Sequence, residues 1–220
     1  MWYNTLKTTA QALGYGVMES VLLWFVARTI ILHDVPLIYT RFKRIFLCSL
    51  AGLLFLLFAF FCPQPYWFGY VIFLCASVLV MYTDALAMLI SRFTTLYLVP
   101  VGWLFAFNNG LYISFLDSIA GTLLGIIILG SVQKISERYY GHAGLGTGDI
   151  DYLACAGAFT GILGMWLTLM LGSFLASLWA LSLILTGKFT RTTPFPFGSF
   201  LAAAGILVLL FKYQIASFLM

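Results

Sequence analysis

Two aspartates, Asp84 and Asp149, are the residues of this chain whose type and placement are best suited to catalysis. Each adjoins one end of a long apolar segment, and carboxylates in such surroundings are costly enough to be functional candidates. Two carboxylates that meet in a low-dielectric pocket cannot both ionise cheaply, so they share one proton. The ionised member could deprotonate a water while the protonated member hydrogen-bonds to a peptide carbonyl. The pair predicts peptide hydrolysis without a nucleophilic side chain or a metal, and it assigns neither the acid nor the base role to either residue.

Glycines are concentrated directly before Asp149, in the stretch Gly144-Leu145-Gly146-Thr147-Gly148. Glycine permits positive φ and close approach of another backbone, which would let a substrate strand lie against the carboxylate. Asp149 is also expected at the start of a helix, where free amides and the helix dipole favour a negative charge. A glycine loop followed by a helix-capping aspartate is a common structural arrangement, so this motif taken alone leaves both readings open.

Composition places these residues in a membrane protein. The chain is 63% hydrophobic and 8% charged, with a mean hydropathy of +1.05, whereas soluble domains are about 25% charged. A soluble fold cannot hide so much apolar surface, because its exterior needs solvated side chains. The net charge of +4 is small and scattered, which argues against nucleic acid as a partner. The four cysteines lie far apart without a C-x-x-C pair, so we expect apolar packing rather than a metal site.

Continuous apolar runs divide the chain into transmembrane helices. A helix needs about 20 apolar residues to cross the hydrocarbon core, and unbroken rather than alternating runs favour helices over a barrel. The predicted spans are Leu13–Leu32, Ile45–Phe61, Trp67–Thr83, Phe93–Phe107, Leu111–Val132, two within Asp149–Leu185, and Phe200–Ile215. The stretch Asp149–Leu185 is too long for one crossing, so we place a split near Gly161–Trp166. The predicted fold class is all-α, a polytopic membrane helix bundle of about eight transmembrane helices that forms one domain over residues 1–220.

Basic residues alternate with uncharged turns along the chain. Every second loop between predicted spans contains basic residues. These are Arg41, Lys43, Arg44, Arg92, Lys134, Arg138, Lys188 and Arg191. The intervening turns near Pro63, Asn108 and Gly164 have no lysine or arginine. Because basic residues are biased toward cytoplasmic loops, this pattern predicts that Asp84 and Asp149 reach the same, cytoplasmic end of the helices.

The other acids receive simpler interpretations. Asp34 and Glu137 fall in polar loops, and Asp117 falls near the outer end of a helix, so we interpret all three as solvated charges. Glu19 and Arg28 lie on the first predicted span, where they could pair with other helices or reach toward the membrane surface.

Taken together, these motifs resemble the type IV prepilin peptidases, a family of membrane aspartic proteases with the signature G-x-G-D. The signature matches Gly146-Thr147-Gly148-Asp149. Further blocks are similar to the family in the same order: Thr83-Asp84 with Thr94 to Pro100 beyond it, Leu153-Ala154 with Gly157-Ala158-Phe159-x-Gly161, and Thr193-Pro194-x-Pro196-Phe197-Gly198. The matching blocks run from Asp84 to about Gly205, over half of the chain.

The resemblance implies removal of the short basic leader from type IV prepilins or pseudopilins, at the cytoplasmic face of the bacterial inner membrane. By the same resemblance Asp84 and Asp149 would be the catalytic residues. The residues that would support the loops around the substrate are Gly146, Gly148, Pro196 and Gly198. The expected partners are the pilin substrate and the lipid bilayer, with no cofactor and no metal, and the oligomeric state stays open.

Three departures from the family pattern carry expectations of their own. The family usually has a lysine two residues after the signature aspartate, where this chain has Asp151. Asp151 could repel the dyad or point elsewhere, and we expect it to point elsewhere. The family's Pro-Asp after its first aspartate is Ser91-Arg92 here. Larger relatives carry a zinc-binding domain with paired C-x-x-C motifs after the first helix and N-methylate the pilin; the corresponding loop here is short and lacks cysteine, so we expect neither zinc nor methyltransferase activity.

Two other functions are compatible with the same aspartates. A non-enzymatic, ion-coupled transporter subunit could use Asp84 and Asp149 as cation sites, but such sites commonly lie on broken helices near mid-membrane, whereas these acids are predicted at one face. A relative that cuts archaeal preflagellins or signal-peptide remnants would share the mechanism, but the P-F-G turn and the G-A-x-x-G continuation favour the bacterial pilin branch. The placement of the two carboxylates discriminates between peptidase and transporter.

Overall fold

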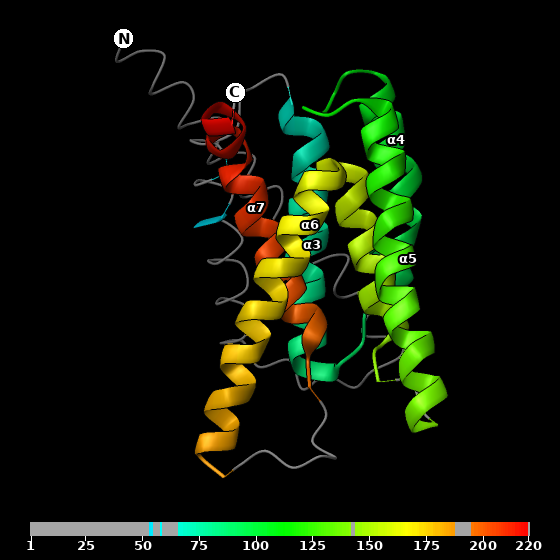
Figure 1. Ribbon diagram of the computed structural model, residues 1–220. Coiled ribbons are helices and arrows are strands. Elements are labelled where there is room, and N and C mark those ends of the chain that lie inside the picture. Colours follow the sequence, from blue (N-terminus) through cyan, green and yellow to red (C-terminus); the bar gives the residue numbers. More distant parts are fainter. Residues whose placement is uncertain (1–52, 55–57, 59–65, 142–143, 188–194, 220) are drawn as a thin grey trace.

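The computed structural model describes residues 53–54, 58, 66–141, 144–187 and 195–219. The regular elements in these ranges are all helical: α3 (Trp67–Ala87), the short 3-10 helices η3 (Arg92–Thr94) and η4 (Leu96–Leu98), α4 (Val99–Phe107), α5 (Phe115–Tyr140), α6 (Thr147–Leu185) and α7 (Phe197–Leu219). The described part of the chain is therefore all-α, as predicted (Figure 1). The predicted span Leu13–Leu32 and nearly all of Ile45–Phe61 lie outside the described residues, so the structure bears only on the later spans.

Helices α3, α5 and α6 are each long and apolar enough to cross a membrane. Large apolar side chains remain exposed on their outer faces, among them Ile127 of α5 and Leu163 and Phe174 of α6. Water would solvate such surfaces poorly, whereas the lipid tails of a bilayer match them, and a helix satisfies its own backbone groups there. The chain is a membrane protein.

The long helix α6 is interrupted at Gly161. A straight helix of its 39 residues would be about 58 Å long, nearly twice the hydrocarbon thickness. Gly161 has φ 74° and ψ −172°, a conformation that is essentially restricted to glycine, and Figure 1 shows the two halves of α6 running in opposite directions. The predicted split of this stretch near Gly161 is confirmed.

Asp117 of α5 stabilises the reversal in α6. Its Oδ1 accepts a 3.1 Å hydrogen bond from the backbone N–H of Ile162, the residue that opens the second half of α6. The first amides of a helix lack partners in their own helix, so the Asp117 carboxylate caps this half through space. The interpretation of Asp117 as a solvated charge was wrong, because its partner lies 45 residues away and no local pattern points to it.

We expect Asp117→Ala to lower the thermal stability of the protein. The change removes the cap and leaves the Ile162 N–H without an acceptor, a loss of about 1–2 kcal/mol. Asp117→Asn keeps an acceptor oxygen and should retain most of the stability. Thermal unfolding of the detergent-solubilised proteins, followed by tryptophan fluorescence, measures the difference. Equal unfolding temperatures for Asp117→Ala and the wild type would show that the cap contributes nothing.

Glycines bring α5 close to the first half of α6. A Cβ placed on Gly121 of α5 would lie 2.7 Å from the backbone carbonyl carbon of Gly161, and one placed on Gly157 of α6 would overlap the backbone of Gly121. Positions without side chains let helix backbones approach closely in membranes. This packing orients the first half of α6, whose N-terminal end carries Asp149.

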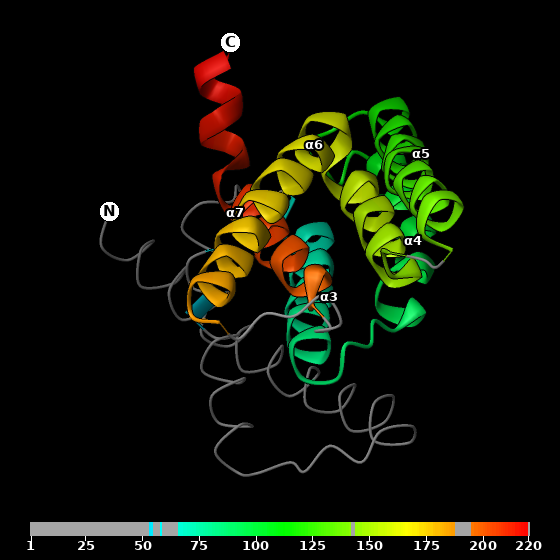
Figure 2. The same ribbon diagram turned by 60° about the horizontal axis from the view of Figure 1, so that its bottom comes forward.

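The core next to the candidate site joins α3, α6 and α7. The hydroxyl of Tyr152 of α6 lies 2.9 Å from the hydroxyl of Ser77 of α3, and both residues are fully buried. The ring of Phe73 stacks against Tyr152 and Phe159, with centroid distances of 6.2 and 5.4 Å. Figure 2 shows α7 beginning between α3 and the two halves of α6. The three elements that carry the site residues are therefore packed against one another.

The fourth predicted span differs from the observed structure. Phe93–Phe107 was predicted as one transmembrane helix, but the chain forms η3 and η4 and then α4, which has nine residues. Pro100 lies at the start of α4, where its missing N–H and its fixed φ are compatible with a helix. An α-helix of this length rises about 13 Å, so α4 alone is too short to cross a bilayer. The segment Arg92–Phe107 is apolar and helical, as predicted, but its first part forms two 3-10 turns in place of the predicted continuous α-helix.

The helix ends alternate between two ends of the bundle. In Figure 1 the C-terminal end of α3 and the N-terminal ends of α6 and α7 lie at the lower end, whereas the α4–α5 turn and the reversal within α6 lie at the upper end. Lys134 and Arg138 lie in the last turns of α5, also at the lower end, and Arg92 pairs with Asp151 near the N-terminal end of α6. The arrangement brings Asp84 and Asp149 to the same end, as predicted.

Candidate functional site

Asp84 lies in the last turn of α3 and is 5% exposed. The helix ends because Met88 adopts a left-handed conformation with φ 53°, and the Met88 N–H donates a 2.9 Å hydrogen bond to the Asp84 carbonyl oxygen. The chain then leaves the helix through Leu89 and Ile90. The predicted helix boundary at Thr83 placed Asp84 just beyond the helix. In the structure Asp84 lies inside α3, which ends at Ala87.

Asp149 lies in the first turn of α6 and is 7% exposed. Gly146 is the N-cap, with extended backbone angles, and its carbonyl oxygen accepts a 3.2 Å hydrogen bond from the Asp149 N–H. Free amides and the helix dipole favour a carboxylate at this end of a helix. The prediction that Asp149 begins a helix is confirmed.

Gly198, from the first turn of α7, lies between the two carboxylates. A Cβ placed on Gly198 would be 2.8 Å from Asp149 Oδ1 and 3.2 Å from Asp84 Cγ. By the sum of these distances the two atoms are at most about 6 Å apart, close enough for one water to hydrogen-bond to both side chains. Three helices therefore meet at this point. Helices α3 and α6 supply the acids, and α7 supplies Gly198, whose missing side chain leaves space between them.

The two aspartates border one pocket of about 260 Å³. Its lining residues are Asp84, Met88, Leu89, Ile90, Gly146, Thr147, Gly148, Asp149, Phe195 and Phe197. Apart from Thr147 and the acids, the lining side chains are apolar, which suits a peptide segment with apolar side chains. Within the described ranges, no group of three or more His, Cys, Asp or Glu side chains is arranged to hold a metal ion.

Gly146 and Gly148 allow close approach in the loop before Asp149. A Cβ on Gly146 would lie 3.2 Å from Asp149 Oδ2, and one on Gly148 would lie 2.7 Å from Ile90 Cβ. Neither glycine has a positive φ. The part of the prediction that concerned positive φ is therefore wrong at both positions, whereas close approach is observed, in this case by side chains.

Pro196 precedes α7 and does not line the pocket. The Phe197 N–H donates a 2.9 Å hydrogen bond to the Phe195 carbonyl oxygen, which closes a tight turn around Pro196. Proline lacks an N–H and disfavours a helical conformation in the residue before it. Pro196 thus defines where α7 begins and, with it, the position of Gly198.

Ser199 contacts Asp84 and was not identified from the sequence. Its backbone N–H donates a 2.6 Å hydrogen bond to Asp84 Oδ2, and its hydroxyl donates to the same oxygen over 2.9 Å. Asp84 thereby satisfies one of the first amides of α7, which have no partner in their own helix. The two residues are 115 positions apart, and a serine near a helix start is too common a signal to reveal such a partner.

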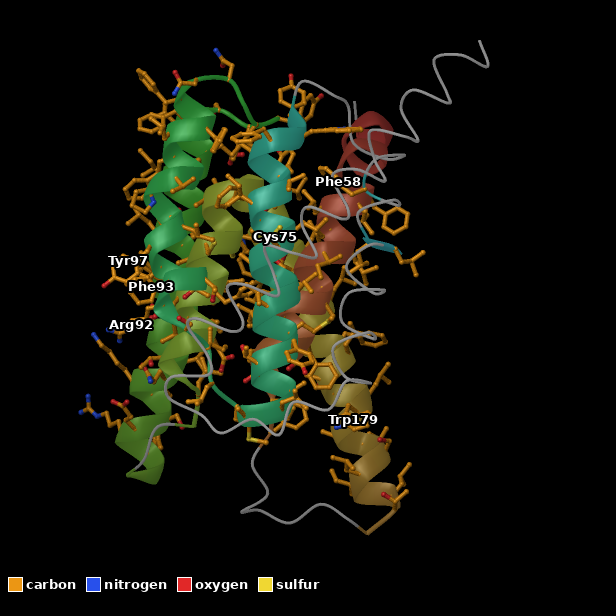
Figure 3. All side chains as sticks on the ribbon, turned by 180° about the vertical axis from the view of Figure 1, so that it is seen from behind. Phe58, Cys75, Arg92, Phe93, Tyr97 and Trp179 are labelled. Atoms are coloured by element: carbon orange, nitrogen blue, oxygen red, sulfur yellow. The ribbon has the colours of Figure 1, made fainter. Side chains whose placement is uncertain are left out.

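Asp151 pairs with Arg92 and does not line the pocket. Arg92 Nε lies 3.4 Å from Asp151 Oδ2, and the two side chains are 63% and 16% exposed. Figure 3 shows Arg92 at the edge of the bundle beside Phe93 and Tyr97. The expectation that Asp151 points away from the dyad is met. Residues 92 and 151 are also two of the positions at which the sequence departs from the family pattern, and the structure brings them into contact.

The fold and the site define a helical membrane protein with two carboxylates at one pocket, at one end of its bundle. Residues 71–181 match the model of the type IV leader peptidase family. The match covers just over half of the chain and includes Asp84 and Asp149. The chain belongs to the type IV leader peptidase family.

Several curated proteins named prepilin leader peptidase/N-methyltransferase are similar to this chain. The protein from Aeromonas salmonicida (strain A449) is 33% identical over 129 residues, which cover 59% of this chain and 44% of that protein. The protein from Stutzerimonas stutzeri is 35% identical over 121 residues, 54% of this chain and 42% of that protein. The protein from Dichelobacter nodosus is 33% identical over 159 residues, 71% of this chain and 54% of that protein. The chain thus spans about half the length of these relatives, and no solved structure matches it significantly.

Proposed function

We propose that this chain is an intramembrane aspartic endopeptidase that removes the basic leader peptide from type IV prepilins or pseudopilins. The observation that carries the proposal is that Asp84 and Asp149 flank one point beside Gly198, at a single pocket. Membership of the type IV leader peptidase family and the names of the curated relatives support this substrate class.

In the proposed reaction one water binds between Asp84 and Asp149, which share a single proton. The ionised carboxylate takes a proton from the water as the water oxygen attacks the scissile carbonyl carbon, and the protonated partner hydrogen-bonds to the carbonyl oxygen. The tetrahedral intermediate then collapses as a proton passes from the dyad to the leaving nitrogen and the C–N bond breaks. The dyad returns to its one-proton state without a covalent intermediate.

The pocket end of the bundle is proposed to face the cytoplasm, in the bacterial inner membrane. Lys134 and Arg138 lie in the last turns of α5 at this end, and Arg92 pairs with Asp151 near the start of α6. The turn between α4 and α5 at the other end has no lysine or arginine. Basic residues are biased toward the cytoplasmic side. A substrate with a basic leader would keep that leader in the cytoplasm and its apolar helix in the bilayer, so that the bond between them lies near the pocket.

The placement of the acids favours the peptidase over an ion-coupled transporter. Asp84 lies in the last turn of α3 and Asp149 in the first turn of α6, at helix ends, whereas transporter sites commonly lie where helices are interrupted near mid-membrane. The interruption in α6, at Gly161, lies at the end of the bundle away from the acids. The proposal covers peptide cleavage alone and does not extend to N-methylation.

Coexpression with a prepilin tests the proposal. The chain is expressed together with a type IV prepilin or a pseudopilin, and the mass of the pilin is measured. We expect a loss equal to the mass of the leader, and no loss without the chain. If every prepilin and pseudopilin tested keeps its leader while the protein is folded and inserted in the membrane, the function is ruled out.

Asp151→Ala should retain leader cleavage at a rate within about fivefold of the wild type, since ion pairs with a largely exposed partner contribute about 0–1 kcal/mol. The Arg92 side chain of this pair is mostly exposed, and Asp151 does not line the pocket. Initial cleavage rates of the purified protein in detergent measure the effect. Complete loss of cleavage in this variant would mean that the reacting carboxylate had been assigned wrongly.

A further inference from the structure

Ser199 supplies the hydrogen bonds that hold one member of the acid pair. We propose that Ser199 is a positioning residue that binds Asp84 Oδ2 and thereby presents Oδ1 to the reacting water. This inference rests on the proposed peptidase function. It specifies which oxygen of Asp84 reacts and which residue makes that oxygen the reactive one. Two donors from Ser199 reach Oδ2, the backbone N–H at 2.6 Å and the hydroxyl at 2.9 Å.

These two donors leave Oδ1 as the reactive oxygen of Asp84. A carboxylate oxygen has two lone pairs in the plane of the group, and both on Oδ2 are directed to Ser199. No donor within the described part of the chain contacts Oδ1. A proton that Asp84 takes up during the reaction therefore goes to Oδ1, and a water between the two acids meets this oxygen of Asp84.

The Ser199 hydroxyl is itself held in place. Its Oγ lies 3.2 Å from the carbonyl oxygen of Met81, one turn before Asp84 on α3, and the residue is 9% exposed. The hydroxyl has one proton and two acceptors, both on the last turns of α3, so its rotation is confined to this side. A carboxylate held by a buried partner loses little freedom when the substrate arrives, which is the preorganisation that proton-transfer groups require.

Consecutive residues of α7 thus perform complementary tasks at the site. Gly198 leaves the space between the two carboxylates, and Ser199 orients one of them. The Asp149 carboxyl has a backbone hydrogen bond from Gly146 but no side-chain donor among the described residues, so of the two acids only Asp84 is held by a side chain of another helix.

Two substitutions at position 199 separate the hydroxyl from the rest of the residue. Ser199→Ala removes the hydroxyl and keeps the backbone N–H, whereas Ser199→Thr keeps both. A hydrogen bond to a charged group is worth enough for its loss to reduce kcat about 10- to 100-fold. Because the hydroxyl contacts Asp84 and not the pocket, KM should change by less than about twofold. Ser199→Thr should restore most of kcat.

Ser118→Ala is the matched control. Ser118 of α5 is fully buried, and its hydroxyl donates a 2.5 Å hydrogen bond to the Ala158 carbonyl oxygen, away from the acid pair. This variant should unfold at a lower temperature with an unchanged kcat. A wild-type kcat in Ser199→Ala, a loss that Ser199→Thr does not restore, or an equal loss in Ser118→Ala would each overturn the proposal.

A double-mutant cycle tests the contact without any substrate. The unfolding temperatures of the wild type, Ser199→Ala, Asp84→Ala and the double variant are compared. Ser199→Ala should lower the unfolding temperature clearly when Asp84 is present and much less when Asp84 is alanine, because only the 3.2 Å contact to the Met81 carbonyl oxygen is then lost. Equal decreases in both backgrounds would overturn the contact, whereas a wild type that cleaves no prepilin but shows the coupling would overturn the proposed function alone.

Discussion

Asp84→Asn and Asp149→Asn should each abolish leader removal while the protein still folds and inserts into the membrane. Both side chains flank the point beside Gly198, and an amide can neither take a proton from water nor share the proton of the dyad. General acid–base groups contribute about 10²- to 10⁴-fold each. Because the two acids act as one unit, the double variant should be no slower than either single variant.

Cleavage rates of the purified variants in detergent or lipid nanodiscs measure this loss. Asp117→Asn is the matched control, because it makes the same acid-to-amide change on α5 at the opposite end of the bundle and keeps an acceptor for the Ile162 N–H. The control should cleave at close to the wild-type rate. Full processing by either Asp84→Asn or Asp149→Asn would remove the aspartyl mechanism.

Gly198→Ala should nearly abolish activity without changing a single polar group. The added methyl carbon would lie 2.8 Å from Asp149 Oδ1 and 3.2 Å from Asp84 Cγ, and it would also overlap the Ile90 side chain. It would occupy the space of the shared water and push the carboxylates apart. Misplacement of reacting groups by about 1 Å can cost about 10²-fold, so we expect at least that decrease in cleavage rate.

Gly130→Ala provides the control for this substitution. Gly130 lies on α5, and a Cβ at this position has no atom within 4 Å. Alanine is the better helix former by about 1 kcal/mol, so this variant should fold at least as well as the wild type and cleave at the same rate. Equal activity of the Gly198 and Gly130 variants would show that the two carboxylates do not meet at Gly198 in the working enzyme.

The helical class and most helix positions were predictable because a bilayer leaves the backbone few alternatives. Each crossing segment must form its own hydrogen bonds, so a long apolar run indicates a helix. Helix ends were less predictable. The run Leu111–Val132 was taken as one span, but α5 occupies Phe115–Tyr140, because a helix continues past the apolar region and hydropathy records only where that region stops.

The candidate site was predictable where its signals are local. Three glycines before Asp149 and the turn at Pro196 could be read directly, since glycine and proline restrict or relax the backbone wherever they occur. Gly146 and Gly148 nevertheless act by lacking a side chain, and neither adopts the positive φ that glycine would permit. The pairing of Arg92 with Asp151 was invisible for a different reason, since it joins separate segments.

Three features follow from the amino-acid order without coordinates: the chain is a helical membrane protein, α6 must be divided, and Asp84 and Asp149 reach the same end of the bundle. These conclusions depend on apolar length, glycine and charge order, which are properties of single segments. The position of Gly198 between the acids and the hydrogen bonds from Ser199 to Asp84 emerge only from the packing of the helices. Ser199 and Asp84 are more than 100 positions apart in the chain. Their contact depends on how α3, α6 and α7 pack together, and no single segment encodes this packing.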